Sequence, residues 1–138
     1  MLVKTIVTDD LPRGVNARNW PGLIKIRPDL KYLGAVWAQE AYEAMLKMAP
    51  WNMILHIFSA SFRRSMELMG HEIEVQAALR FYEADSEKYR WSEAYALVHG
   101  YDDFSGYTEE KVERELRKRS KQAVRWVDDY ADDIREWV

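Results

Sequence analysis

Hydrophobic and polar positions divide this chain into a short strand-like beginning and a long helical remainder. The segments 2–8 and 23–27 hold short apolar runs bounded by charged residues, proline and glycine, which predicts two β-strands. From about residue 33 onwards, apolar residues recur every three or four positions, as on one face of a helix. The pattern therefore predicts a predominantly helical α+β fold in which a small N-terminal β-hairpin or sheet packs on helices.

The segment between the two predicted strands, residues 9–22, is rich in proline, glycine and asparagine and is predicted to be a loop. Such a length is unusual for a connection inside a compact domain, which favours a role for the loop itself. Arg13, Arg18 and Trp20 would line a groove in one interpretation. In the other interpretation, the loop only wraps the edge of the sheet.

Three helices are predicted in the middle of the chain. The first begins at about residue 29 or 33 and ends at residue 49, because Pro50 cannot continue a helix. The second runs from about residue 51 towards residues 63–64. The third begins at about residue 65 and reaches residue 91 or beyond, with Asp85-Ser86 or Gly100 as its end.

The most apolar window is residues 49–62, and it is too short to span a bilayer, which needs about 20 residues. A buried hairpin corner between two helices is the favoured interpretation of this window. A second interpretation stays open, because the Arg63-Arg64 pair that follows suits contact with a membrane surface.

A long C-terminal helix is predicted from residue 108 to residue 137, with Thr108 as its N-cap and Glu109 and Glu110 in its first turn. Its apolar positions form one stripe. These positions are Val112, Leu116, Ala123, Val127, Tyr130, Ile134 and Trp137. The polar face is either solvated or binds a partner, and the helix is then a candidate surface for a protein partner or for self-association.

Composition places the chain among globular proteins of one domain, residues 1–138. Hydrophobic residues make up 48% and charged residues 31%, which suits a packed core. The absence of cysteine excludes disulfides and thiolate metal sites, so a metal would need histidine or carboxylate ligands. A net charge of −3 gives no general case for nucleic-acid binding. The N-terminus lacks the apolar core of a signal peptide, and no transmembrane segment is predicted.

The candidate chemistry lies in the first predicted helix, at Gln39-Glu40-Ala41-Tyr42-Glu43. A zinc peptidase places two imidazoles one helical turn apart, with a glutamate beside the first as general base on zinc-bound water. In this frame Glu40 is the base, Gln39 stands at the first histidine position and Glu43 at the second. Glu74-Val75-Gln76-Ala77, on a later helix, fits the glutamate that supplies the third ligand.

On these residues the chain resembles the short, glutamate-type zincin-like metallopeptidases of phage and prophage genomes, over residues 20–82. The resemblance implies a zincin-like core in residues 1–107, with residues 108–138 as a helical extension outside it. It also implies a cleft beside Glu40, peptidase ancestry, and a cytoplasmic or virion-associated protein.

Two of the three ligand positions depart from the family pattern. The Gln39 amide is a poor zinc ligand, and carboxylates suit harder cations better. His71 lies three residues before Glu74, on the same helix face, and would compensate. A divalent metal (Zn, Mn or Mg) would then be held by Glu43, His71 and Glu74. Without a metal, the crowded glutamates would need a proton or an arginine partner, and the candidates are Arg63, Arg64 and Arg80.

Several functional hypotheses follow. The leading one is a catalytically degenerate peptidase scaffold that serves as a phage-related binding or structural protein. The second is an active metal-dependent hydrolase that cuts a peptide or a peptidoglycan cross-link, with Glu40 as general base. The third is an accessory module that docks through its aromatic surface or its last helix. A di-iron carboxylate bundle fits poorly, because its Glu-x-x-His order is reversed here.

Overall fold

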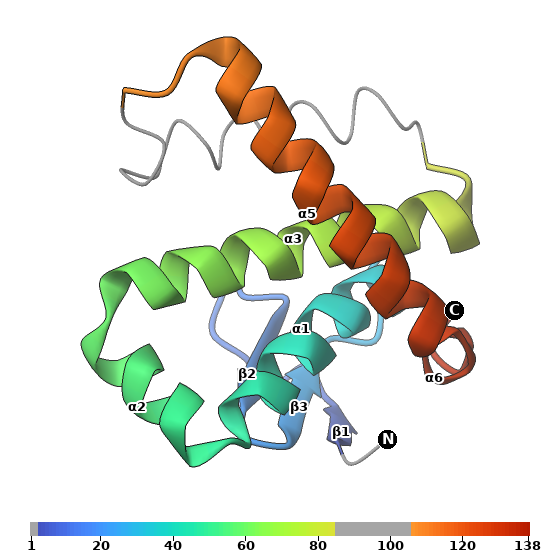
Figure 1. The fold of residues 1–138 in the computed structure, drawn as a ribbon. Coiled ribbons are helices and arrows are strands. Elements are labelled where there is room, and N and C mark those ends of the chain that lie inside the picture. Colours follow the sequence, from blue (N-terminus) through green and yellow to red (C-terminus); the bar gives the residue numbers. More distant parts are fainter. Residues whose placement is uncertain (1–2, 85–105) are drawn as a thin grey trace.

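The computed structural model describes residues 3–84 and 106–138 (Figure 1). A small sheet lies against α1, α1 lies against α3, and α5 crosses α3 (Figure 1). This arrangement confirms the predicted mostly helical α+β fold. The elements are β1 (Lys4–Val7), β2 (Ala17–Trp20), β3 (Leu23–Ile26), α1 (Leu33–Lys47), α2 (Pro50–Phe58), α3 (Ala60–Tyr82), α5 (Glu109–Asp129) and α6 (Ala131–Arg135).

The sheet has the strand order β1-β3-β2, with β3 parallel to β1 and antiparallel to β2. The two-residue turn Pro21-Gly22 joins β2 to β3, and Gly22 has a φ of 68°, which glycine adopts without steric cost. Strand β2 lies inside the segment predicted to be a loop, so that prediction is wrong at residues 17–20. Its inward positions are Ala17 and Asn19 while Trp20 is exposed, so the strand shows no hydrophobic alternation.

Arg27, the residue after β3, holds the rest of the β1–β2 connection in place through hydrogen bonds. Its guanidinium donates hydrogen bonds to four backbone carbonyl oxygens of this connection. The acceptors and distances are Val15 (2.8 Å), Leu11 (2.8 Å), Asp9 (3.1 Å) and Pro12 (3.2 Å). One side chain thus supplies the hydrogen-bond donors for four carbonyl groups of a segment that has no regular secondary structure. These hydrogen bonds explain how the irregular connection is ordered.

Replacing Arg27 with methionine keeps most of the aliphatic stem and removes all of these donors. Hydrogen bonds to a charged group contribute about 1.5–3 kcal/mol each when buried, and two of these four are solvent-exposed. We expect a loss of about 2 kcal/mol in the free energy of unfolding, measured by urea denaturation, and faster amide exchange in residues 9–16. Arg13→Met is the control, because Arg13 is exposed in the same connection. Equal losses in both variants would contradict the anchoring role of Arg27.

Helix α1 is the centre of the core. Its alanines at positions 35, 38, 41 and 44 are fully buried and allow the sheet and α3 to approach it closely. Trp37 is the largest buried side chain of the described residues, and its indole nitrogen donates to the Thr5 hydroxyl at 2.9 Å. The helix ends at Lys47, two residues before the predicted end at residue 49, and Pro50 begins α2.

The corner between α2 and α3 differs from the prediction. The segment 49–62 is not a buried hairpin corner, because α2 has no buried residue. The chain breaks at Ser59, whose hydroxyl accepts a hydrogen bond from the Phe62 amide at 3.1 Å and so caps α3. Helix α3 therefore begins earlier than the predicted residue 65.

Helix α3 ends at Tyr82, before either predicted end, because Glu83 adopts a left-handed conformation with a φ of 50°. Both predicted helix ends, at 85–86 and at 100, lie outside the described residues.

The predicted C-terminal helix is two helices. The Thr108 hydroxyl accepts a hydrogen bond from the Lys111 amide at 3.2 Å, which confirms the predicted N-cap. The helix is interrupted at Tyr130, and the short α6 follows. Leu116, Ala123, Val127 and Ile134 of the predicted stripe are buried. Residues of α5 and α6 join the same core cluster as those of α1 and α3. Among the described residues, no helix is long and apolar enough to cross a bilayer.

Candidate functional site

Two glutamates of α1, Glu40 and Glu43, meet the side chain of Asn19 on β2. The Asn19 amide nitrogen donates to Oε2 of Glu43 at 2.8 Å and also to Oε2 of Glu40. Glu43 is almost entirely buried, with 6% of its surface exposed, and Glu40 is half-buried. One amide group thus bridges both carboxylates, which lie one helical turn apart.

Lys47 determines which way the Asn19 amide faces. Its ammonium group donates to the Asn19 side-chain oxygen at 2.7 Å. An ammonium group has no acceptor, so the amide oxygen must face Lys47 and the NH₂ group must face the carboxylates. Lys47 thus orients the bridge and places a positive charge close to both glutamates.

Both carboxyl groups have a pKa above the ordinary value of a glutamate. Burial, and next the charge of Glu40, raise the pKa of Glu43 to about 8, although Asn19 and Lys47 act in the opposite direction. Burial also raises the pKa of Glu40, and the charge of Glu74 adds to this rise. A carboxyl in water titrates near 4.5, so Glu43 retains its proton at neutral pH.

Helix α3 approaches this pair at Gly70. A Cβ atom at Gly70 would lie 3.1 Å from Oε1 of Glu43 and 3.2 Å from Cγ of Gln39. Gln39 and Glu43 therefore lie on the face of α1 that contacts α3. One turn further along α3, Glu74 lies close enough for its negative charge to raise the pKa of Glu40. The absence of a side chain at Gly70 allows this close approach.

The structure brings together only part of the predicted metal-ligand set. His71 and Glu74 are adjacent, with Nδ1 of His71 3.6 Å from Oε2 of Glu74. Within residues 3–84 and 106–138, no group of three or more histidine or acidic side chains is arranged to hold a metal ion. Metal binding by Glu43, His71 and Glu74, and the role of Glu40 as a base, stay predictions.

The partners of the crowded glutamates differ in part from those expected from the sequence. Arg80 pairs with Asp128 of α5. Arg63 donates to the backbone oxygens of His56 and Ile57 at 2.8 and 3.0 Å. Asn19 contacts the Glu40–Glu43 pair instead and Lys47 holds Asn19, although neither residue was among the predicted partners. Lys47 carried a sequence signal, because it lies four residues after Glu43 on the same helix.

A second polar contact between helices involves Glu72, which is 3% exposed at the packing of α3 against α5. The Ser120 hydroxyl donates to Oε1 of Glu72, and the Gln76 amide donates to the same oxygen at 3.2 Å. A buried carboxylate held by donors on both helices links α5 to α3. Glu72 therefore belongs to the packing of the C-terminal helix.

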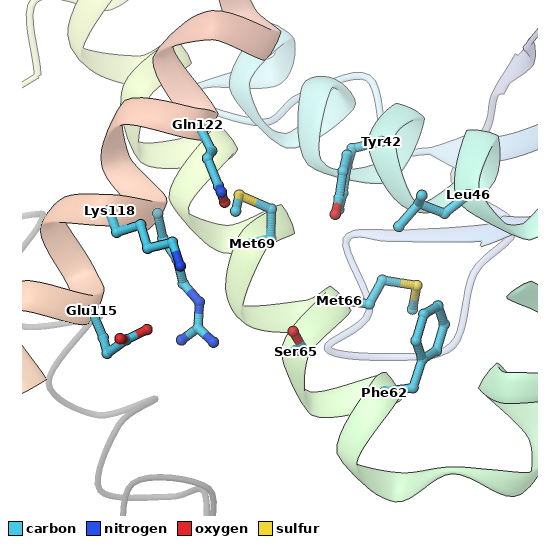
Figure 2. A pocket seen from close by; sticks show the side chains of 10 residues that line it. Tyr42, Leu46, Phe62, Ser65, Met66, Met69, Glu115, Lys118 and Gln122 are labelled. Atoms are coloured by element: carbon cyan, nitrogen blue, oxygen red, sulfur yellow. The ribbon is translucent and has the colours of Figure 1, made fainter. Parts of the chain in front are cut away.

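A cavity of about 310 Å³ opens between α1, α3 and α5 (Figure 2). Mostly apolar side chains of α1 and α3, with Ser65 among them, line one side, and polar side chains of α5 line the other. The residues are Tyr42, Leu46, Phe62, Ser65, Met66, Met69, Glu115, Lys118, Arg119 and Gln122. Its lining includes neither Glu40 nor Glu43, so this cavity is separate from the carboxylate pair.

In comparisons with known proteins, no protein-family model, no curated protein and no solved structure matches this chain. The carboxylate pair and its surroundings therefore have to be interpreted from their own geometry.

Proposed function

We propose that this chain is a zincin-like metallopeptidase scaffold that has lost catalysis and serves as a binding or structural protein. The bridge from Asn19 to both Glu40 and Glu43 is the observation that carries the proposal. An NH₂ group is a donor only and cannot ligate a metal ion, and here it occupies one oxygen of each carboxyl group. The bridge therefore gives Glu43 a partner within the protein, where an active enzyme would present this position to a metal ion.

The arrangement of α1 and α3 supports the peptidase ancestry in this proposal. Gln39 and Glu43, the positions where a zincin has its two histidines, both face Gly70 of α3. Glu74, the position of the third ligand, lies one turn along the same helix. These placements support a zincin-like origin, while the donor atoms are an amide and a buried carboxyl that favours its proton, both poor zinc ligands.

Metal content tests the proposal most directly. We expect wild-type protein, purified without a histidine tag or chelator, to carry no stoichiometric zinc, manganese or magnesium by elemental analysis. Thermal unfolding should also show no saturable stabilisation on adding any of these ions. Stoichiometric metal that is lost in Glu74→Ala would overturn the proposal and favour the hydrolase, in which Glu40 is the general base.

A reverting variant tests the ancestry separately. Gln39→His combined with Glu43→His places two imidazoles one turn apart beside Glu74, which is the donor set of a glutamate-type zinc site. We expect this variant to bind one zinc ion, and we expect the same variant with Glu74→Ala to bind it at least about tenfold more weakly. Equal zinc binding with and without Glu74 would contradict a zincin-like arrangement of the two helices.

A further inference from the structure

Helix α2 exposes most of its large apolar side chains. Trp51 is exposed by 67%, Ile57 by 55% and Phe58 by 82%, while Met53 and Leu55 are half-buried. Its two polar side chains, Asn52 and His56, are half-buried against the rest of the protein. A surface helix normally directs its apolar stripe inward, so the outward stripe of α2 calls for an apolar environment outside the protein.

The exposed side chains lie on one face of the helix. Trp51, Ile54 and Phe58 are spaced by three and four residues, which places them along one stripe, and Ile57 adjoins it. We call these four residues the α2 face. It has tryptophan and phenylalanine near its two ends, residue types that are typical of the apolar face of a helix lying in a membrane interface.

The chain around the α2 face is positively charged. Residues 44–66 contain none of the protein's 23 acidic residues but include Lys47, Arg63 and Arg64, although the protein as a whole has a net charge of −3. The Arg63 guanidinium lies at the C-terminal end of α2, where it donates to the His56 and Ile57 carbonyl oxygens. The segment that carries the α2 face thus has only cationic charged residues, which makes it complementary to a negatively charged apolar surface.

The electrostatic environment of His56 on α2 agrees with a local excess of positive charge. Burial lowers the pKa of His56, and the charges of Lys47 and Arg63 lower it further, while Glu67 of α3 acts in the opposite direction. Contact between two copies through their α2 faces would bring these like charges together. The charge pattern therefore favours an anionic partner over a second copy of this chain.

From these observations we propose that the α2 face binds the interfacial region of a membrane that contains anionic phospholipids. With nine residues, α2 is about 14 Å long, which suits a helix lying in the plane of the interface and not across it. The indole, phenyl and isoleucine side chains enter the boundary between headgroups and acyl chains. Arg63, at the C-terminal end of α2, contacts the lipid phosphates.

Vesicle co-sedimentation with the full chain tests this inference. The vesicles are phosphatidylcholine alone, or phosphatidylcholine with about 30% phosphatidylserine. We expect binding to the anionic vesicles that weakens as NaCl rises from about 0.1 to 0.5 M. Trp51→Ser combined with Phe58→Ser should lower partitioning more than about tenfold. Val7→Ser combined with Val124→Ser removes exposed apolar side chains on β1 and α5 and should bind like wild type.

Three results would overturn the inference. The first is equal binding of the α2 variant and wild type, or no binding by either. The second is equal binding to both kinds of vesicle. The third is a concentration-dependent dimer in sedimentation equilibrium that the α2 variant abolishes, because the face would then be covered by a second copy. All substituted residues are exposed, and circular dichroism with urea unfolding verifies that each variant is folded.

Discussion

Replacing Glu43 with glutamine is expected to stabilise the protein at alkaline pH and to remove most of the pH dependence of its folding between pH 5 and pH 9. Glu43 is buried, and its neutral form is the one that the fold favours. Glutamine has nearly the same shape as the protonated carboxyl and carries no charge at any pH. The variant should therefore match wild type within about 1 kcal/mol at pH 5 and exceed it at pH 9.

The direction of the pH dependence follows from the number of protons bound by the folded and the unfolded state. The pKa of Glu43 is about 8 in the folded protein, against 4.5 for the unperturbed group. Between these values the folded state holds the proton and the unfolded state does not, so wild-type stability is full below pH 4.5 and falls as pH rises towards 8. The difference between the two pKa values corresponds to a loss on the order of 5 kcal/mol in the free energy of unfolding, which is comparable with the whole stability of a small domain.

Urea unfolding at several pH values checks this expectation. Glu113→Gln is the matched control, because Glu113 is a partly exposed glutamate of α5 that pairs with Arg117 at 2.6 Å. Loss of such a surface pair changes stability by less than about 1 kcal/mol. If wild type and Glu43→Gln lost stability in parallel from pH 5 to pH 9, the buried proton on Glu43 would be excluded.

Trp37→Ala is expected to cause one of the largest losses of stability available in the described core. The Trp37 ring is 2% exposed and stacks on Trp137, with ring centroids 5.7 Å apart and an interplanar angle of 18°. It thus joins α1 to the C-terminal end of the chain, while its hydrogen bond to Thr5 joins α1 to β1. Truncating a buried tryptophan costs about 3–5 kcal/mol, so the variant should unfold at much lower urea concentration.

Two variants separate the contributions at this position. Trp37→Phe keeps most of the apolar contact but leaves the Thr5 hydroxyl without its donor, and we expect a loss of about 1–2 kcal/mol. Trp51→Ala removes an exposed tryptophan and should stay within about 0.5 kcal/mol of wild type. A loss for Trp37→Ala no larger than that for Trp51→Ala would contradict its place in the core.

Local signals accounted for much of the helical fold. Pro50 and Thr108 marked a helix end and a helix start, and apolar spacing identified the face of α5 that packs on α3. The errors lie where local signals were weak. Strand β2 was missed because Ala17 and Asn19 face inward, and the break at Tyr130 has no proline or glycine to mark it.

The candidate site was predictable only in part. Glu40 and Glu43 were identified because their spacing along one helix is local information. Asn19 was not, because it meets them from another strand, 21 and 24 residues earlier in the chain. The exposure of the α2 face was also mispredicted, since an apolar window gives no indication of whether its residues face the core or the solvent.

The sequence by itself determined which segments are helical, where several of them start and stop, and that a pair of glutamates shares one helical turn. These properties depend on backbone sterics and on spacings of three or four residues, which act within a few residues of the chain. Only the tertiary structure decided what surrounds that pair. Burial, the Asn19 bridge and the Lys47 charge come from β2, α1 and the close approach of α3 at Gly70. Because desolvation and hydrogen bonding depend on groups distant in the chain, the protonation of Glu43 is a property of the folded state alone.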